Sequence, residues 1–367
     1  MKNKKFKYFN VNKIIQKLLL LFIIMLLYLY IEKYDSLGLK LCVCTYGKKE
    51  NRYIREFVEY YKKYGVDKIY LYDNNDIKGE RFEEVIGDYI KENFVEIVNF
   101  RGIPYAYLKI MDDCYQKNFY KYDWLIFYEI DEFIFLKNYK NIKYYLNQKK
   151  FNKCQKIQLN WVHRSDNNLF HYKNMSVVKR FKQIGKNVKK NKFNRLGFIK
   201  TIIRGNLPIS ITNNHYLNRD IKGCDGEGRY VKYKWILNPN PDYEKYFINH
   251  YYSKSLEEFV NKLKRGDGEK GISKKNDYYQ IRKFFYINKI TLRKIEYLEK
   301  HLGVDLSQYK TKLNYSILIY HINYLEKTLF SYIWHYRYSR IKYQKKLSKK
   351  TIFKYITHIY VISFIPF

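Results

Sequence analysis

Acidic residues follow an apolar stretch near the middle of the chain. The stretch from Trp124 to Phe133 reads WLIFYEIDEF and carries Glu129, Asp131 and Glu132 directly after its apolar residues. Glu129 and Asp131 are two residues apart, so they lie on the same side of an extended backbone. Carboxylates arranged in this way can hold Mn²⁺ or Mg²⁺, and such a cation neutralises charge on a departing diphosphate. An acidic turn at a strand end, without a metal, is the alternative interpretation.

Polar residues also follow two earlier apolar segments. The segment KIYLYD predicts a strand that ends in Asp73, where a carboxylate can hydrogen-bond a ribose or a base. The segment LKLCVCT predicts a strand that runs into Thr45 and Gly47, where a tight turn lets backbone approach a ligand. Ligands of parallel sheets bind beyond the carboxyl ends of the strands. Together, the three strand ends therefore predict one binding site.

The elements that must position these residues alternate along the chain. Apolar residues at helical spacing predict helices over residues 52–64, 82–90 and 107–120, and VEIVNF predicts a third strand. Strands that alternate with helices in this way are typical of an α/β fold with a largely parallel sheet. After residue 150 the short segments KIQLNWVH, KTIIR and NHYL are strand candidates, and helical patterns dominate from Ser255 onward.

The ordered set of segments resembles the glycosyltransferase family 92 group and its bacterial relatives. The run CVCTYGKKENRYIREFVEYYKKYGVDKIYLYDNND is followed by DWLIFYEIDEFIFL, then by NW with DNN, KTIIR and INHYYSKSLEEF, in the family's order. Those enzymes are GT-A transferases related to family 2. The resemblance therefore implies a GT-A-type, Rossmann-like mixed sheet flanked by helices over residues 38–265. Glu129 stands where the family motif begins with Asp, which keeps a carboxylate but gives it a longer reach.

The resemblance implies roles for the residues at matching positions. Asp131 is expected to bind the metal, with Glu129 assisting through the ribose or a metal-bound water, and His250 to close on the metal or the diphosphate. The residues expected to bind the nucleotide sugar are Thr45, Glu50, Asp73 and Lys254.

An inverting transfer also needs a general base that takes the proton of the acceptor hydroxyl. Asp166, in the HRSD loop, is the first candidate, and Glu132 is the alternative. The alternative interpretation is that Glu132 is structural and only orients the strand end. The remaining candidate histidines are expected to be structural, and His215 is a second candidate for the role of His250.

By resemblance, the activity is transfer of a galactose-like hexose from a UDP-linked sugar to a glycan or lipid-linked acceptor. Two other interpretations stay open. One is a membrane-anchored basic binding protein, and the other is a folded but inactive transferase whose site is spoiled by Glu129. No recognised nucleic-acid-binding module is present in the sequence, so no nucleic-acid partner is expected.

The charge and the cysteines select no partner by themselves. Lys and Arg number 71 against 35 Asp and Glu, which gives a net charge of +36. This excess fits an anionic ligand or surface, but biased codon usage that inflates Lys, Asn, Ile and Tyr gives the same composition. The five cysteines occur at scattered spacings that predict neither a disulfide framework nor a zinc site.

The N-terminus predicts a membrane anchor. A basic leader precedes the apolar run Leu18–Ile31, which, counted from Ile14, just reaches the roughly 17–25 residues of a spanning helix. A buried core helix is the alternative. We therefore expect a leader and anchor over residues 1–37, with the N-terminus in the cytoplasm. A helical, basic and aromatic extension is expected over residues 266–367, either as an interfacial membrane helix or as a plain helical subdomain.

Overall fold

The computed structural model divides the chain into two compact units, Met1–Lys289 and Ile290–Phe367. The residues that the structure describes are 11–186, 197–213, 215, 217–218, 220–232, 236–266 and 274–343. Residues 1–10 of the predicted basic leader and residues 344–367 of the predicted C-terminal extension lie outside the described residues.

The first unit contains a mixed β-sheet. Its strands are β1 (Leu41–Gly47), β2 (Lys68–Asp73), β3 (Val95–Asn99), β4 (Trp124–Phe127), β5 (Glu132–Leu136), β6 (Lys156–His163), β7 (Gly197–Arg204), β8 (Gly223–Cys224), β9 (Tyr230–Val231), β10 (Leu237–Asn238) and β11 (Tyr246–His250). The main order is β3-β2-β1-β4-β7-β6-β11-β5. β1 pairs in parallel with β2 and β4, whereas β7 is antiparallel to both β4 and β6. The predicted mixed α/β sheet is confirmed, with its parallel part centred on β1.

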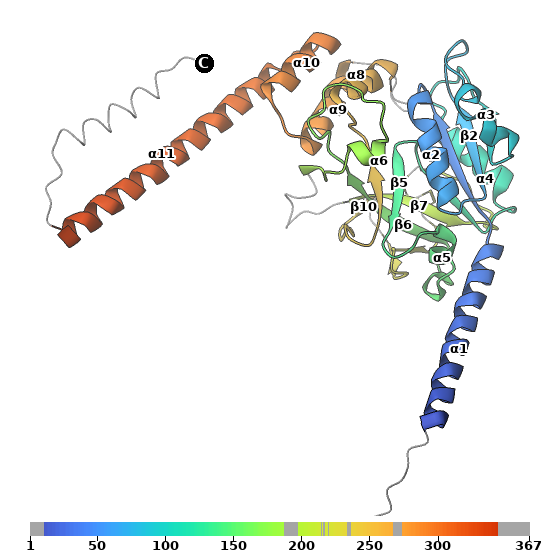
Figure 1. The fold of residues 1–367 in the computed structure, drawn as a ribbon. Coiled ribbons are helices and arrows are strands. Elements are labelled where there is room, and N and C mark those ends of the chain that lie inside the picture. The colour runs from blue at the N-terminus through green and yellow to red at the C-terminus, as the bar shows by residue number, and fades with distance from the viewer. Residues whose placement is uncertain are drawn as a thin grey trace, which may run out of the picture. The chain divides into compact units, whose positions relative to one another are not determined.

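Helices flank this sheet, and α2, α3 and α4 lie beside the first strands (Figure 1). The helices of the first unit are α1 (Val11–Gly38), α2 (Asn51–Lys63), α3 (Glu83–Lys91), α4 (Tyr107–Asn118), α5 (Ile142–Leu146), α6 (Val177–Arg180), α8 (Leu256–Arg265) and α9 (Lys274–Ile287), with a 3₁₀ turn η1 (Lys149–Phe151). The second unit contains α10 (Leu292–Leu302) and α11 (Ser307–Tyr343).

Alternating residues of β1 divide the interior into two cores. Leu41 and Val43 pack with Phe57 of α2 in one hydrophobic cluster, whereas Cys42 packs with Met111 of α4 in another. Successive strand residues point to opposite faces, and each helix turns one apolar stripe inward. The helix predicted over residues 52–64 is therefore confirmed as α2, with its apolar residues buried.

Two segments differ from their predicted structure. The backbone expected to be extended through Glu129 and Asp131 is a strand only as far as Phe127, and the chain turns before β5 begins at Glu132. This break allows the acidic residues to leave the sheet. In place of the strand expected at NHYL, the described residues form an isolated bridge between Asn213 and Leu217.

The predicted membrane anchor is not supported. Helix α1 covers the apolar run, but none of the helices in the described part of the chain is both long and apolar enough to cross a membrane. The prediction of a single-pass membrane protein with a cytoplasmic N-terminus is therefore wrong.

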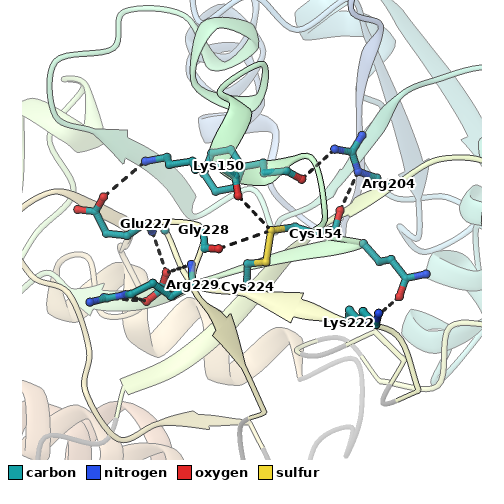
Figure 2. The surroundings of a disulfide bond; sticks show 12 residues. Lys150, Cys154, Arg204, Lys222, Cys224, Glu227, Gly228 and Arg229 are labelled. Carbon is teal, nitrogen blue, oxygen red and sulfur yellow. Dashed lines mark hydrogen bonds and ion pairs between the residues drawn. A yellow bond between two sulfur atoms is a disulfide. The ribbon is translucent and has the colours of Figure 1, made fainter.

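Two disulfides correct the prediction made from the cysteines. Cys44 of β1 is bonded to Cys114 of α4, and Cys154 is bonded to Cys224 of β8. Figure 2 shows the second bond, where Arg204 donates from Nε to the Cys154 carbonyl at 2.7 Å. Both pairs are 70 residues apart in the sequence. Only the fold brings them together, which is why their spacing gave no signal.

Candidate active site

A cavity of about 300 Å³ opens beyond the carboxyl ends of β1, β2 and β4. Gly47 at the end of β1 lies in register with Asp73 of β2. Gly47 is required here, because a Cβ atom would lie 2.6 Å from Ile130 and 2.7 Å from Phe82. The lining includes Gly47, Asn74, Glu129, Asp131, Lys262 and Arg265.

Asp131 lies between a histidine and a lysine. Its Oδ1 is 3.5 Å from His250 Nε2, and its Oδ2 is 3.0 Å from Lys262 Nζ. Burial by itself would raise the pKa of the Asp131 carboxyl. The charges of Lys262 and His250 outweigh burial and hold this pKa well below its usual value. Asp131 is therefore a carboxylate at neutral pH.

His250 ends β11 and is buried. Burial lowers the pKa of His250 to about 4, although Asp131 opposes the shift. The imidazole is therefore neutral at pH 7 and can donate a lone pair to a metal. Trp161 lies beside it, with a ring-centroid distance of 4.2 Å, and His163 of β6 lies 5.2 Å away. The parallel pairing of β6 and β11 sets this arrangement, since His163 is in register with His250.

Lys200 of β7 joins two of the acidic residues inside the protein. Its Nζ is 2.7 Å from Glu129 Oε1 and 3.3 Å from Glu132 Oε1, and its side chain is 1% exposed. Burial alone would raise the pKa of Glu129, but Lys200 outweighs it and lowers that pKa to about 2. Burial raises the pKa of Glu132 to about 8, against the charge of Lys200. The negative charge is therefore concentrated on Glu129.

A second cavity, of about 430 Å³, adjoins the first around Glu50. Arg265 Nη1 forms an ion pair with Glu50 Oε1, and Lys254 Nζ lies 3.7 Å from Glu50 Oε2. Lys254 also lies 3.9 Å from the centroid of the Tyr53 ring. Helix α8 carries Arg265, and a capping box between Ser255 and Glu258 fixes where this helix begins.

Comparison with protein families decides what kind of site this is. The family model described as Glycosyltransferase family 92 matches residues 38–286, more than half of the chain. This chain belongs to glycosyltransferase family 92. The family match includes the β4 carboxylates, α8 and nearly all of α9, and thus extends beyond the predicted boundary at residue 265. The protein is therefore a transferase by family, which implies a sugar donor and an acceptor.

The solved structures to which this chain is similar include structures of TarS of S. aureus. TarS residues 1–349 align with 75% of this chain and 78% of that chain, at 10% identity and a TM-score of 0.32. The same fragment in complex with UDP aligns over 37% of this chain and 38% of that one, at 11% identity and a TM-score of 0.28. The longer TarS structure aligns over 67% of this chain and 43% of that chain, at 9% identity and a TM-score of 0.30. In two of these three alignments, less than half of the TarS chain is covered. No curated protein matches the transferase.

The structure brings together most of the residues expected around the transferase metal. Glu129 and Asp131 both line the first cavity, and His250 contacts Asp131. Within the described residues, no group of three or more His, Cys, Asp or Glu side chains is arranged to hold a metal ion. Lys200 contacts Glu129 Oε1 and Lys262 contacts Asp131 Oδ2, so both carboxylates already have a lysine partner. Asp131 Oδ1 faces the neutral His250 imidazole instead.

Two residues expected to bind the nucleotide sugar lie behind the wall of the first cavity. Asp73 is 2% exposed, accepts hydrogen bonds from Asn75, and forms an ion pair with Arg101 at 2.5 Å. Thr45 is 1% exposed. Neither is among the residues that line the two described cavities, whereas Glu50 lines both and Lys254 lines the second.

The two candidate bases occupy different surroundings. Asp166 is buried, its Oδ1 accepts from the Asn168 amide, and its own amide donates to Asn288 Oδ1. Glu132 is fully buried, and its Oε2 accepts from the Glu129 amide at 2.9 Å.

Three basic residues of this site were not predicted from the sequence. Lys200, Lys262 and Arg265 contact the acidic residues, yet they come from β7 and α8, far along the chain. The signal for Lys262 and Arg265 was present, because both fall on the polar side of an amphipathic helix that directly follows INHYYSKS. Lys200 carried no signal, since a lysine in KTIIR is not distinguishable from a solvent-facing residue of a strand.

Proposed function

We propose that this transferase moves a hexose, galactose-like and UDP-linked, to a carbohydrate acceptor with inversion of configuration. The observation that carries the proposal is the first cavity, which places Asp131 beyond the parallel strands where GT-A-type enzymes bind their donors. Within it, Lys262 and Arg265 add positive charge on the side of Asp131 that faces α8.

Asp131 and His250 are the residues that would hold Mn²⁺ or Mg²⁺. A bound cation would offset the negative charge that develops on the departing diphosphate. The donor set supports this assignment, because Asp131 Oδ1 is a buried atom without a hydrogen-bond partner and His250 Nε2 lies 3.5 Å from it, so one cation could contact both. Lys262 lies against Asp131 and would share the carboxylate with the cation.

The far end of the first cavity suits the nucleoside. Asn74 and Tyr105 line it, and the Tyr105 side chain is 65% exposed, so its ring offers a face on which a uracil can stack. Glu50 can accept hydrogen bonds from ribose hydroxyls at the boundary between the two cavities. Asp73 and Thr45 would then shape the wall behind the nucleoside.

The proton of the acceptor hydroxyl needs a base, and Asp166 and Glu132 remain the two candidates. Asp166 follows β6, on the side of the sheet where β11 delivers His250. Glu132 is closer in sequence to Asp131. Its contacts to Lys200 and to the Glu129 amide favour a role in holding the strand end.

A screen of UDP- and GDP-linked sugars for hydrolysis and transfer, with and without Mn²⁺, tests the proposed function. The expected result is turnover of a UDP-hexose that requires the metal and is inhibited by UDP. Turnover of GDP-sugars alone would contradict the donor assignment. Equal turnover in EDTA would contradict the metal assignment.

A further inference from the structure

The second cavity is lined by more basic than acidic residues. The basic residues are Lys49, Arg52, Lys254, Lys262, Lys264 and Arg265, and the acidic ones are Glu50, Glu80 and Glu258. A cleft with this excess of one charge raises the local concentration of ligands of the opposite charge.

The carboxylates that line this cavity already form ion pairs or accept hydrogen bonds within the protein. Glu258 forms a two-point ion pair with Arg180, at 2.8 and 2.9 Å, outside the cavity lining. Glu80 Oε1 accepts from the Asn51 amide at 2.9 Å, and Glu50 is shared by Arg265 and Lys254, as described above. Glu50 and Glu258 are therefore paired with cations, and Glu80 is the carboxylate of this lining for which the described residues show no ion pair.

Two cations of the lining remain unneutralised. Among the residues that the structure describes, no carboxylate oxygen lies within 4 Å of the Arg52 guanidinium or the Lys264 amino group. Arg52 instead lies 4.6 Å from the centroid of the Tyr172 ring, which leaves its N–H groups available to a ligand. Both side chains are exposed at the mouth of the cavity.

Lys254 gives the cavity a buried cation in an unusual backbone conformation. It is 5% exposed and has a φ of +49°, in the left-handed region that lysine rarely adopts. Residues held in such a conformation cluster at binding sites. Here it holds the amino group between Tyr53 and Glu50 at the inner wall.

The two cavities share the residues of one wall, namely Glu50, Tyr252, Lys262 and Arg265. A ligand in the second cavity would therefore lie next to a donor in the first. We infer that the second cavity is the acceptor site and that it binds a carbohydrate acceptor bearing a phosphate group, held by Arg52, Lys254 and Lys264. This inference rests on the proposed function, because the first cavity is taken as the donor site.

Titration calorimetry with inorganic phosphate, on protein saturated with UDP and Mn²⁺, tests this inference. Phosphate is expected to bind with UDP in place. The double variant Arg52→Gln/Lys264→Gln should bind phosphate at least about tenfold more weakly, because two charge-assisted hydrogen bonds are lost. The same variant should keep its affinity for UDP. Lys117→Gln, an exposed change on α4, is the matched control and should behave as the wild type.

The outcomes separate this inference from the proposed function. Displacement of phosphate by UDP would assign the second cavity to the donor and overturn the inference, as would equal phosphate affinity in the double variant. Failure of the wild type to bind UDP would instead refute the proposed donor site. In a transfer assay, a phosphorylated sugar acceptor should be preferred over its neutral counterpart. The double variant should lose that preference because its KM for the phosphorylated acceptor rises.

Discussion

Lys200 reaches across from β7 to Glu129, with 2.7 Å between its Nζ and the Oε1 atom of the carboxylate. The contact links the antiparallel part of the sheet to the chain segment that leaves the parallel part. The same amino group lies 3.3 Å from Glu132, so one cation contacts both acidic side chains. The Glu129 side chain is long enough to make this contact.

Replacing Lys200 with Met should destabilise the domain strongly. The change leaves Glu129 and Glu132 without their cation, and removal of one partner from a buried ion pair costs about 3–5 kcal/mol. Urea unfolding measures the effect. The triple variant Lys200→Met/Glu129→Gln/Glu132→Gln removes the stranded charges and should recover most of the stability. If Lys200→Met alone were as stable as the wild type, the contacts of Lys200 with Glu129 and Glu132 would contribute little to stability.

The metal assignment predicts different behaviour for the two neighbouring acids. Asp131→Asn should weaken UDP binding in Mn²⁺ by at least about 10–100-fold, since even changes behind a metal ligand have effects of that size. Glu129→Gln should keep metal-dependent binding, because Glu129 already contacts Lys200. Calorimetry with UDP, with and without Mn²⁺, distinguishes them. If both variants lose the metal dependence equally, Glu129 is a ligand as well.

The choice of base is tested by rate rather than by affinity. Asp166→Asn keeps the size and shape of the side chain, and loss of a general base typically lowers the rate by about 10²–10⁴-fold. Single-turnover transfer at saturating UDP-sugar measures this loss, and UDP affinity should stay unchanged. Glu132→Gln is the parallel variant. If Asp166→Asn transfers sugar at nearly the wild-type rate while Glu132→Gln is inactive, Glu132 is the base instead.

Stability should fall in mild acid because of His215. Burial lowers the pKa of His215 from 6.5 to about 3, and its Nδ1 lies 2.7 Å from the Ile199 carbonyl, as expected for a neutral ring that donates there. The unfolded chain takes up a proton first, so stability present at neutral pH is lost as the pH falls from about 6.5 toward 3, by up to about 1.4 kcal/mol per pH unit. Urea unfolding at pH 7 and pH 5 measures this slope. His215→Asn, which retains a donor near the carbonyl, should show a shallower slope.

Local pattern was sufficient to predict the first half of the fold. Alternation in β1 and β2 and the amphipathic spacing of α2 are properties of short segments, and those segments formed the expected elements. The carboxylates after β4 were predictable for the same reason, because an apolar strand must end where charged residues begin.

The later half was less predictable because its important contacts join distant segments. The ion pair of Arg265 with Glu50 joins residues from opposite ends of the domain, and the pairing of His250 with His163 depends on strand order. The covering of Asp73 by Arg101 also could not be read from a strand end alone. Neither spacing nor composition contains this information.

The two disulfides enclose separate stretches of chain, one from Cys44 to Cys114 and the other from Cys154 to Cys224. Because the loops do not overlap, neither bond has to wait for the other during oxidative refolding. Cys42, however, is a buried free thiol two residues from Cys44. An unfolded chain can therefore pair Cys114 with either thiol, and the incorrect isomer is corrected only by thiol–disulfide exchange. Refolding yield should accordingly depend on a redox buffer, and a Cys42→Ala chain should need it less.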